Sequence, residues 1–352
     1  MVDWTASMEQ TYEFYEVDPN TWGDKKLIEV ATSCNIDRDL TSLTLGSASI
    51  NCTGTLNECY IRVYLITIQN GVKDKHPLGT FLVQTPSESF DGTVSTVSVD
   101  AYTPLIELKE SPPPLGYSVL KGQNIMELAS GLTSDYARAP VTLARSDKTL
   151  SGNFVANTDD TWLSFLTDFI AQAKFKYDLD EMGRILFAPE QDTASLQPVW
   201  TYTDDNSSIL LPDITVDRDL YGVPNVVEVV YSSDDNFFYS VVTNDDDNSP
   251  ISIKNRGRRI VHRETNPSFS GEPTQQLIDE YAEQLLRNLS SLEYTISYSH
   301  GYCPVRIGDC VLLNYESAGL KNIKAKVIRQ SIECVTGCTV SETAVFTTKL
   351  WG

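Results

Sequence analysis

Histidine, cysteine and carboxylate side chains are the candidates for catalysis or metal binding in this chain. Histidine is considered first because it is a common general base and metal ligand. His76, His262 and His300 lie far apart on turn-rich or strand-edge segments, so a catalytic triad or metal cluster has little to build from. The sequence also lacks the nucleophile elbow, the zinc-protease motif, the phosphate-binding loop and the dinucleotide fingerprint. We therefore expect no catalytic, cofactor-binding or metal-binding residue, and no cofactor.

The seven cysteines are an odd number in a chain whose first residues show neither a basic start nor an apolar export signal. In a reducing compartment they are expected to be free thiols that pack as small apolar side chains. Cys303, Cys310, Cys334 and Cys338 could form a zinc set, but their spacings lack the two-residue knuckle of such sites. Free thiols are the favoured interpretation.

Acidic residues dominate the charge: 48 Asp and Glu stand against 27 Lys and Arg, for a formal net charge of −21. Such a surface repels phosphate, which argues against tight, sequence-independent binding of nucleic acid. A glycosidase pair stays possible among so many carboxylates, because only their separation in space would reveal one. The clusters 204–207 and 245–248 resemble calcium loops in composition alone, without the spacing, central glycine and final glutamate of an EF-hand. Solvated loops are favoured there.

One segment is basic, with Lys254, Arg256, Arg258, Arg259 and Arg263 close together. It could meet nucleic acid or an acidic partner. We favour a solvated strand whose charge is balanced by the acidic residues just upstream.

The elements that must position these residues begin with β-strands over residues 1–108. Val97, Val99 and Ala101 alternate with polar residues, which is typical of a half-buried strand. The expected elements are Tyr60–Ile68, the turn Asn70-Gly71, Gly79–Val83, the turn Asp91-Gly92 and Thr93–Tyr102. Short strands with glycine turns indicate a small barrel or sandwich. The proline run at Ser111–Pro114 is expected to mark its end, and a stiff surface loop inside one domain is the alternative.

The middle of the chain reads as α+β. Its clearest helix starts at Asp159 or Asp160 and has an apolar stripe of Trp162, Phe165, Leu166, Phe169, Ile170 and Ala173. The other expected elements are a helix near Asn124–Gly131, a hairpin of Phe175–Leu179 and Arg184–Ala188, paired strands at Ile214–Val216 and Val226–Tyr231, and a helix over Thr274–Ser291 opened by Pro273. From Tyr294 to Trp351 the pattern is β again, with strands at Val305–Ile307, Val311–Asn314 and Lys324–Ile332.

The length of 352 residues allows two or three domains. No apolar run approaches the roughly 20 residues that span a bilayer, so we expect no membrane anchor and folding in the cytoplasm of the producing cell.

The order of these elements resembles the tail hub proteins (baseplate hub, or tail-associated proteins) of long-tailed bacteriophages and related contractile particles. The segments that carry the resemblance are Asn157–Lys174, Tyr177–Pro189, Asp213–Tyr231, Thr274–Leu289 and Pro304–Leu313. Each is a generic structural device taken alone, and it is their order and spacing that resemble the family.

The resemblance implies a mainly β, α+β fold with two tail-tube-like β-barrel domains and a peripheral α+β domain. The first barrel would be 1–108 and the second 200–232 with 294–352. Residues 109–199 would form the peripheral domain. Residues 233–293, which interrupt the second barrel and which we call the excursion, would be part of the same peripheral domain.

The resemblance also implies a function without an enzymatic step. The chain would be a homotrimer that forms a pseudo-sixfold ring at the virion tail tip and is made in the host cytoplasm. Its partners would be a tail tube or distal tail protein, a spike, fibre or tip protein, and the tape-measure protein, with DNA passing transiently through an acidic channel. A tail-associated cell-wall hydrolase and a carbohydrate- or receptor-binding β module are the alternatives. We expect no hydrolase domain, because the chain ends at Gly352 after a β segment.

Overall fold

The computed structural model describes residues 2–54, 56–90, 92, 95–191, 193–233, 236–269 and 274–351, apart from the side chains of 85–89, 95 and 96. The chain divides into two compact units. The first consists of Met1–Ile214 and Ser297–Ala344, and the second of Thr215–Ile296 and Val345–Gly352. Each unit is described by itself.

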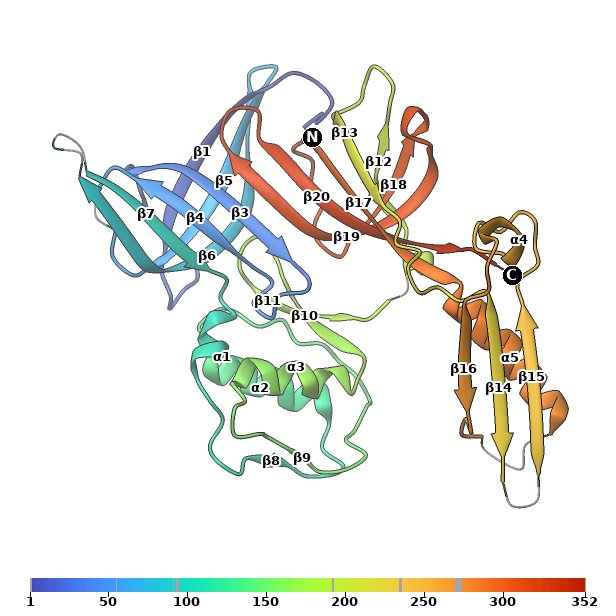
Figure 1. Cartoon of the computed structure of the whole chain (residues 1–352). Coiled ribbons are helices and arrows are strands. Elements are labelled where there is room, and N and C mark those ends of the chain that lie inside the picture. The colour runs from blue at the N-terminus through green and yellow to red at the C-terminus, as the bar shows by residue number, and fades with distance from the viewer. Residues whose placement is uncertain are drawn as a thin grey trace. The chain divides into compact units, whose positions relative to one another are not determined.

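The fold is mainly β, as predicted, and its largest element is a 13-stranded sheet within the described residues (Figure 1). Its strands are β1 (Glu9–Val17), β2 (Asp24–Leu27), β3 (Ala31–Asp39), β4 (Gly46–Cys52), β5 (Tyr60–Gln69), β6 (Val72–Phe90), β7 (Ser95–Tyr102), β12 (Pro198–Thr203), β13 (Leu210–Asp217), β17 (Ser291–Gly301), β18 (Cys310–Tyr315), β19 (Leu320–Cys334) and β20 (Thr339–Lys349). The strand order is β13-β17-β20-β19-β3-β4-β7-β6-β5-β1-β2, and β12 joins through β18, which pairs with β19.

Alternation of apolar and polar residues decides which face of this sheet is buried. On β4, Ala48, Ile50 and Cys52 are buried while the residues between them are partly exposed. These side chains share one core with Ile36 of β3 and Ile61 of β5. Strand β5 is buried at eight successive positions, and two of these, Arg62 and Thr67, are polar.

The helical part of the first unit contains α1 (Ile106–Glu110), α2 (Ile125–Tyr136) and α3 (Trp162–Ala171), with the strand pairs β8 (Ser118–Val119)–β9 (Phe154–Val155) and β10 (Phe175–Leu179)–β11 (Ile185–Pro189). The apolar stripe predicted for α3 is buried at all six positions. The predicted start is corrected by one or two residues: Thr161 caps α3 through a capping box with Ser164, and Asp160 lies before it. The predicted hairpin is confirmed as β10–β11.

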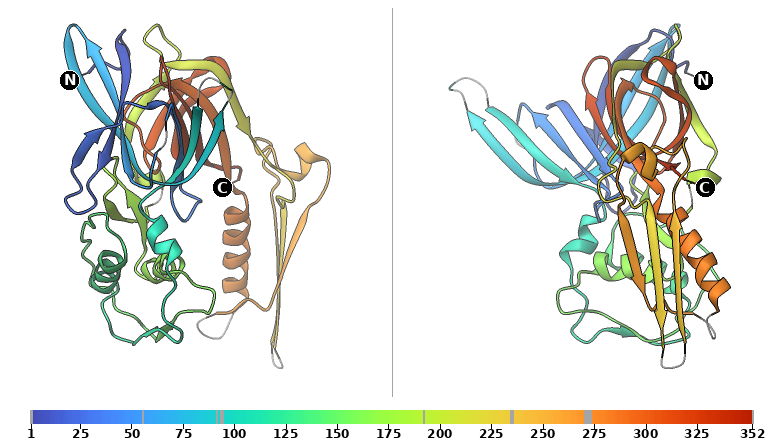
Figure 2. Two further views of the ribbon diagram at one scale, coloured as in Figure 1. Left: turned by 90° about the vertical axis from the view of Figure 1, so that its left-hand side faces the viewer. Right: turned by 45° about the vertical axis from the view of Figure 1, so that its right-hand side comes forward.

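The second unit is a three-stranded sheet covered by one helix. Its elements are β14 (Val226–Ser232), β15 (Phe237–Thr243), β16 (Val261–Thr265), α4 (Ile253–Arg256) and α5 (Gln275–Leu289). Helix α5 runs alongside the sheet strands (Figure 2). Ile278, Ala282 and Leu286 of α5 share one core cluster with Val227 and Val229 of β14. Thr274 caps α5, and the predicted opening residue Pro273 lies outside the described residues.

Several predicted elements differ from the structure. Strands β13 and β14 exist but do not pair: β13 joins β17, and β14 pairs with β15 and β16. Residues 305–307 form no strand, and the predicted strand Gly79–Val83 is part of the longer β6. Asp91, in the predicted Asp91-Gly92 turn, lies outside the described residues. Two short 3-10 turns, η1 (Thr193–Ser195) and η2 (Glu316–Ala318), complete the fold.

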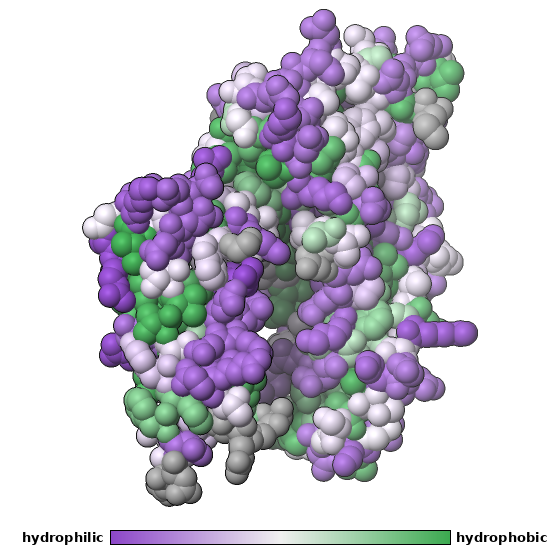
Figure 3. Space-filling view, turned by 90° about the vertical axis from the view of Figure 1, so that its right-hand side faces the viewer, coloured by the Kyte–Doolittle hydropathy of each residue, from purple (hydrophilic) through white to green (hydrophobic). Residues whose placement is uncertain are grey.

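The two barrels and their boundaries stay a prediction. Strand β14, which the prediction places in the second barrel, pairs with β15 and β16 of the predicted excursion 233–293. Among the described residues, no helix is both long and apolar enough to cross a membrane. On the face drawn in Figure 3, apolar side chains lie in small groups among hydrophilic ones.

Candidate functional site

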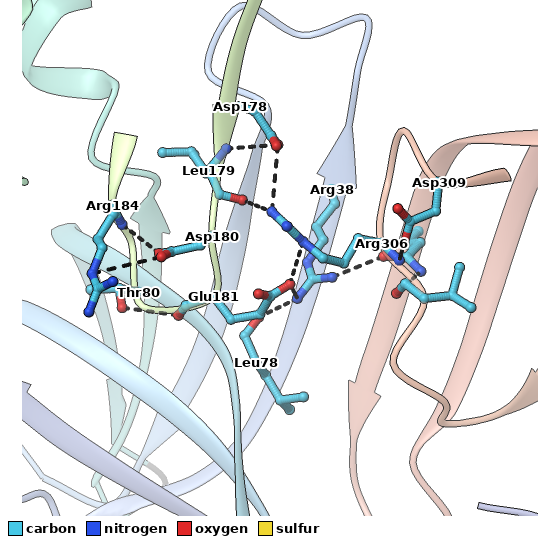
Figure 4. Close-up of polar contacts among 12 residues, drawn as sticks. Arg38, Leu78, Thr80, Asp178, Leu179, Asp180, Glu181, Arg184, Arg306 and Asp309 are labelled. Carbon is cyan, nitrogen blue, oxygen red and sulfur yellow. Dashed lines mark hydrogen bonds and ion pairs between the residues drawn. The ribbon is translucent and has the colours of Figure 1, made fainter. Parts of the chain in front are cut away.

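The tip of the β10–β11 hairpin carries a group of charged side chains that comes from three parts of the chain, and we call it the hairpin joint (Figure 4). It consists of Asp178, Glu181, Arg38 and Arg306. Arg306 Nε lies 2.7 Å from Glu181 Oε1, and Arg306 Nη2 lies 3.6 Å from Asp178 Oδ1 and donates to the carbonyl oxygen of Leu179. Residues before β18 are thereby tied to the hairpin.

Strand β3 reaches the same hairpin tip through Arg38. Its Nη2 lies 3.7 Å from Glu181 Oε1 and donates to the Leu78 carbonyl at 2.5 Å, while Nη1 donates to Gln330 Oε1 at 3.0 Å. The joint therefore connects three parts of the chain: the early strands, the helical region and the late strands.

Residues 182 and 183 at the hairpin tip contact early strands. Trp22 Nε1 donates to the Met182 carbonyl at 2.7 Å, and Arg62 Nη2 donates to the same oxygen at 3.0 Å. Gly183 adopts φ +74°, and a Cβ built there would lie 2.6 Å from Thr80 Cβ. The turn needs glycine both for its backbone and for its close approach to β6.

The chemistry open to the hairpin joint is ion pairing. Burial opposes the charge of Arg306, but Glu181 and Asp178 outweigh it and raise its pKa. Burial raises the pKa of Asp309, whose carboxylate accepts from the Arg306 backbone N–H at 2.8 Å. A cavity of about 40 Å³ lies beside Arg38, Glu181 and Arg306, which is room for about one water molecule. The joint is built to hold parts of the chain together.

A second polar cluster, which we call the sealed cluster, contains His300, Glu342, Tyr202, Tyr298 and Cys303. His300 Nε2 lies 3.4 Å from Glu342 Oε1, and both side chains are 0% exposed. Tyr298 Oη donates to Glu342 Oε2 at 2.7 Å. Gln330 Nε2 also donates to Glu342, at 2.5 Å from Oε1.

The sealed cluster combines a thiol, an imidazole and a carboxylate, the residue types of nucleophilic catalysis. Cys303 Sγ lies 3.9 Å from His300 Nδ1, and Tyr202 Oη lies 3.0 Å from His300 Nε2. Burial disfavours the charged imidazole, but hydrogen bonds to Cys303 and Glu342 and the charge of Glu342 raise the pKa of His300 to about 10. A histidine that holds its proton in this way is a poor base, and a buried set has no path for a substrate.

Sequence reasoning missed the sealed cluster. We had placed His300 on a turn-rich or strand-edge segment, whereas it is fully buried on β17. The alternation of Tyr294, Ile296 and Tyr298 along that strand, all buried, was the signal that His300 faces inward.

The four cysteines considered as a zinc set are not brought together. Cys334 and Cys338 share one core cluster with Cys34, whereas Cys303 lies beside His300 and Cys310 opens β18. The seven cysteines are free thiols, as predicted, and Cys59 is the one that is not buried. Within the described ranges, no group of three or more His, Cys, Asp or Glu is placed to hold a metal ion.

Several carboxylates of the acidic loops and cations of the basic segment have partners within the chain. Asp205 Oδ1 accepts from Ser207, and Asp204 Oδ2 accepts from Ser317. Lys254 Nζ lies 2.6 Å from Asp247 Oδ2. An acidic residue upstream of the basic segment therefore neutralises one of its charges, as expected from the sequence.

The basic segment departs from that expectation at its other end. Arg263 Nη2 lies 2.7 Å from Glu228 Oε2, and Arg259 Nη2 lies 4.0 Å from Glu228 Oε1, so strand β14 supplies this carboxylate. Part of the segment, moreover, is the helix α4 and not a strand.

No family model and no curated protein matches this chain. Solved structures do. The tail protein from Neisseria meningitidis MC58 has a TM-score of 0.62 at 14% identity, over 96% of this chain and 96% of that one. The 43 kDa tail protein of prophage MuSo2 from Shewanella oneidensis has a TM-score of 0.61 at 12% identity, over 97% and 98%.

A chain of the Francisella PdpA-VgrG complex has a TM-score of 0.57 at 9% identity, and the match covers 97% of this chain and 58% of that one. At such identities the likeness concerns the fold. The chain has the fold of phage tail proteins, and the resemblance drawn from its sequence is confirmed at that level.

Proposed function

We propose that this chain, which has the fold of phage tail proteins, is a structural subunit of a phage-type tail or baseplate and forms its hub. The observation that carries the proposal is the match over nearly the full length of two tail proteins, at TM-scores of 0.62 and 0.61. A match that includes both β regions and the α+β middle favours a shared architecture over one shared module.

In the finer form of this proposal, three copies form a pseudo-sixfold ring that joins the tail tube to a tip or spike. The ring surrounds a channel for DNA. A tail tube or distal tail protein would bind one side, a spike, fibre or tip protein the other, and the tape-measure protein would end at the ring. The protein would be located at the tail tip of the particle.

The hairpin joint supports a structural role. It ties early strands, the helical region and late strands together through two arginines that share Glu181. The net charge of −21 per chain supports a channel that repels DNA, because a wall rich in Lys and Arg would bind phosphates and hold the polymer.

The proposal includes no enzymatic step. The residue types suited to nucleophilic catalysis gather in the sealed cluster, where His300 and Glu342 are 0% exposed. A cell-wall hydrolase would need a carboxylate pair or nucleophile that a substrate can reach.

An electron cryomicroscopy map of the particle that contains this chain tests the proposal directly. We expect three copies around the tail axis at the junction of tube and tip. Finding the chain away from that axis, or finding a monomer that turns over peptidoglycan, would overturn it.

A further inference from the structure

Two cysteines stand opposite each other where strands β3 and β19 stop pairing. Cys34 and Cys334 are the last pair of the antiparallel ladder that joins the early strands of the first unit to its late strands. Residues directly opposite in such a ladder have their side chains on the same face of the sheet. Both thiols are buried, at 4% and 2% exposed, and belong to one hydrophobic core. The fold therefore brings together two thiols from nearly opposite ends of the chain.

The backbone geometry of this pair suits a disulfide bond. Opposite residues in an antiparallel ladder have Cα atoms roughly 4.5 or 5.5 Å apart, depending on their place in the hydrogen-bond pattern. A disulfide needs a Cα separation of roughly 4.4–6.8 Å, so either place allows the bond without a shift of the strands. The thiols also interact: a hydrogen bond with Cys34, followed by burial, raises the pKa of Cys334.

Two other cysteines of the same core are alternatives. Cys52 of β4 stands opposite Ala31, whereas the residue of β4 opposite Cys34 is Ile50. Cys52 is therefore a diagonal neighbour of Cys34, and such residues lie roughly 7–8 Å apart, beyond the reach of a disulfide.

The second alternative, Cys338, lies beyond the turn that follows β19. Burial raises the pKa of Cys338, and a hydrogen bond with Tyr12 opposes that rise, so this thiol is engaged by the phenol. Cys34 is the better partner for Cys334.

A short exposed turn, residues 335–337, follows the cysteine pair. Tyr12 of β1 holds this turn by donating from Oη to the Val335 carbonyl at 2.8 Å. Burial raises the pKa of Tyr12, and the thiols of Cys338 and of the pair raise it further, which places the phenol beside them. The end of the ladder is therefore closed by a side chain and a turn.

The end of a strand ladder opens more readily than its middle. Local opening breaks a few contacts, whereas exposing a core strand requires global unfolding. Opening here requires the loss of the hydrogen bond from Tyr12 and of the last pairing of β19. A thiol must lose its proton to react, and burial keeps the closed pair unreactive. Oxidation is therefore limited to the moments when the turn opens.

We infer that Cys34 and Cys334 form a disulfide when the turn 335–337 opens in an oxidising medium, and that this bond locks the early strands to the late strands. The oxidant is a small disulfide such as oxidised glutathione. One protein thiolate attacks a sulfur of the oxidant and displaces one small thiol, and the second thiolate attacks the resulting mixed disulfide and displaces the other. The protein pair loses two protons and two electrons, and the oxidant is reduced to two thiols.

The compartment decides the state of the pair. In a reducing cytoplasm, where the sequence predicts folding, the pair stays as two thiols, and the bond forms once the protein reaches an oxidising exterior. Because the two cysteines lie far apart in the chain, their bond constrains a long loop of the unfolded chain and so stabilises the fold. This inference goes beyond the proposed function and applies to the purified chain.

The test uses the purified full-length chain with Cys59→Ala, which removes the cysteine that is not buried. The chain is incubated with oxidised glutathione, and mass spectrometry of the intact protein and of its peptides follows the bond. We expect the loss of two hydrogen atoms, mapped to Cys34 and Cys334 and reversed by dithiothreitol, and a Tm about 5 °C higher in the oxidised form. Adding Cys338→Ala should leave the bond intact, whereas Cys34→Ala or Cys334→Ala should abolish it.

Tyr12→Phe tests the closure of the turn. It removes the hydroxyl that holds the turn, so oxidation should be about fivefold faster. Tyr15→Phe is the matched control on the same strand, since it removes a hydrogen bond of 3.1 Å to Glu13 and should leave the rate unchanged. Equal rates in the two variants would overturn the control of oxidation by the turn.

Three results would overturn the bond itself. The first is a chain whose mass stays unchanged even with Tyr12→Phe. The second is a bond that maps to Cys334 and Cys338. The third is a glutathione adduct on Cys34 or Cys334 that does not go on to close.

Discussion

The hairpin joint and the sealed cluster use the same chemistry in opposite surroundings. Each pairs a cation with a carboxylate and adds neutral hydrogen-bond partners. His300 and Glu342 are 0% exposed, whereas Arg306 and Glu181 are 31% and 22% exposed. Water can therefore replace lost contacts at the joint but not in the cluster.

The contrast shows how burial changes the contribution of an ion pair to stability. A buried pair costs a great deal when one partner is removed, because the other charge is left without solvent. A partly exposed pair is screened by solvent and contributes less to stability. We expect the sealed cluster to contribute more to the free energy of unfolding of the protein. We expect the hairpin joint mainly to reduce local opening of the β10–β11 hairpin.

The largest effect should follow Glu342→Ala, which leaves His300 buried with its charge unpaired. We expect a loss of about 3–5 kcal/mol in the free energy of unfolding, measured by denaturant titration. Glu333→Ala, an exposed glutamate on the neighbouring strand, should change stability by less than about 0.5 kcal/mol. Equal effects of the two variants would show that the cluster is not sealed.

The next largest effect should follow Gly183→Ala at the hairpin tip. The left-handed backbone and the approach to Thr80 together should cost about 2–4 kcal/mol. Gly222→Ala is the matched control, since Gly222 has φ +72° with nothing within 4 Å of a built Cβ. Its cost should be about 1 kcal/mol. If the melting temperature falls equally in both variants, the contact with Thr80 contributes nothing.

A smaller effect is expected at the joint from Arg306→Ala. The variant leaves the Leu179 carbonyl and Glu181 with fewer partners, for a loss of about 1–3 kcal/mol. Arg184→Ala removes an arginine 55% exposed that lies 3.8 Å from Asp180, and it should cost less than about 0.5 kcal/mol. Hydrogen exchange of the β10–β11 amides should quicken in the first variant and not in the second.

The smallest effect is a pH dependence. The pKa of His300 is raised to about 10, so its contribution to stability is full below the unfolded pKa near 6.5 and is lost as pH rises through about 10. Between pH 7 and 8 the free energy of unfolding should fall by about 1 kcal/mol.

The ring of His300 should accordingly remain protonated by NMR at pH 8. Burial lowers the pKa of His76, which should already be neutral there and serves as the internal control. A neutral His300 at pH 7 would contradict the ion pair with Glu342.

Local patterns predicted the elements well. The stripe of α3 and the alternation before Tyr102 depend on neighbouring residues and were read directly from the sequence. Pairing was harder, because β14 takes β16 as a parallel partner across a long connection, and the sequence gives no register for it.

The sites were harder still. Arg306 and Leu179 are 127 residues apart in the chain, and Tyr202 and Glu342 are 140 apart. No local period joins such residues, and only the fold brings them within hydrogen-bond distance.

The seam between β3 and β19 has a consequence for biosynthesis. Ser331 and Asn35 meet there although 296 positions separate them. Pairing so distant must wait until the ribosome has made nearly the whole chain, so the open edge of β3 stays exposed meanwhile. Nascent chains of this protein should need a chaperone until that edge is closed.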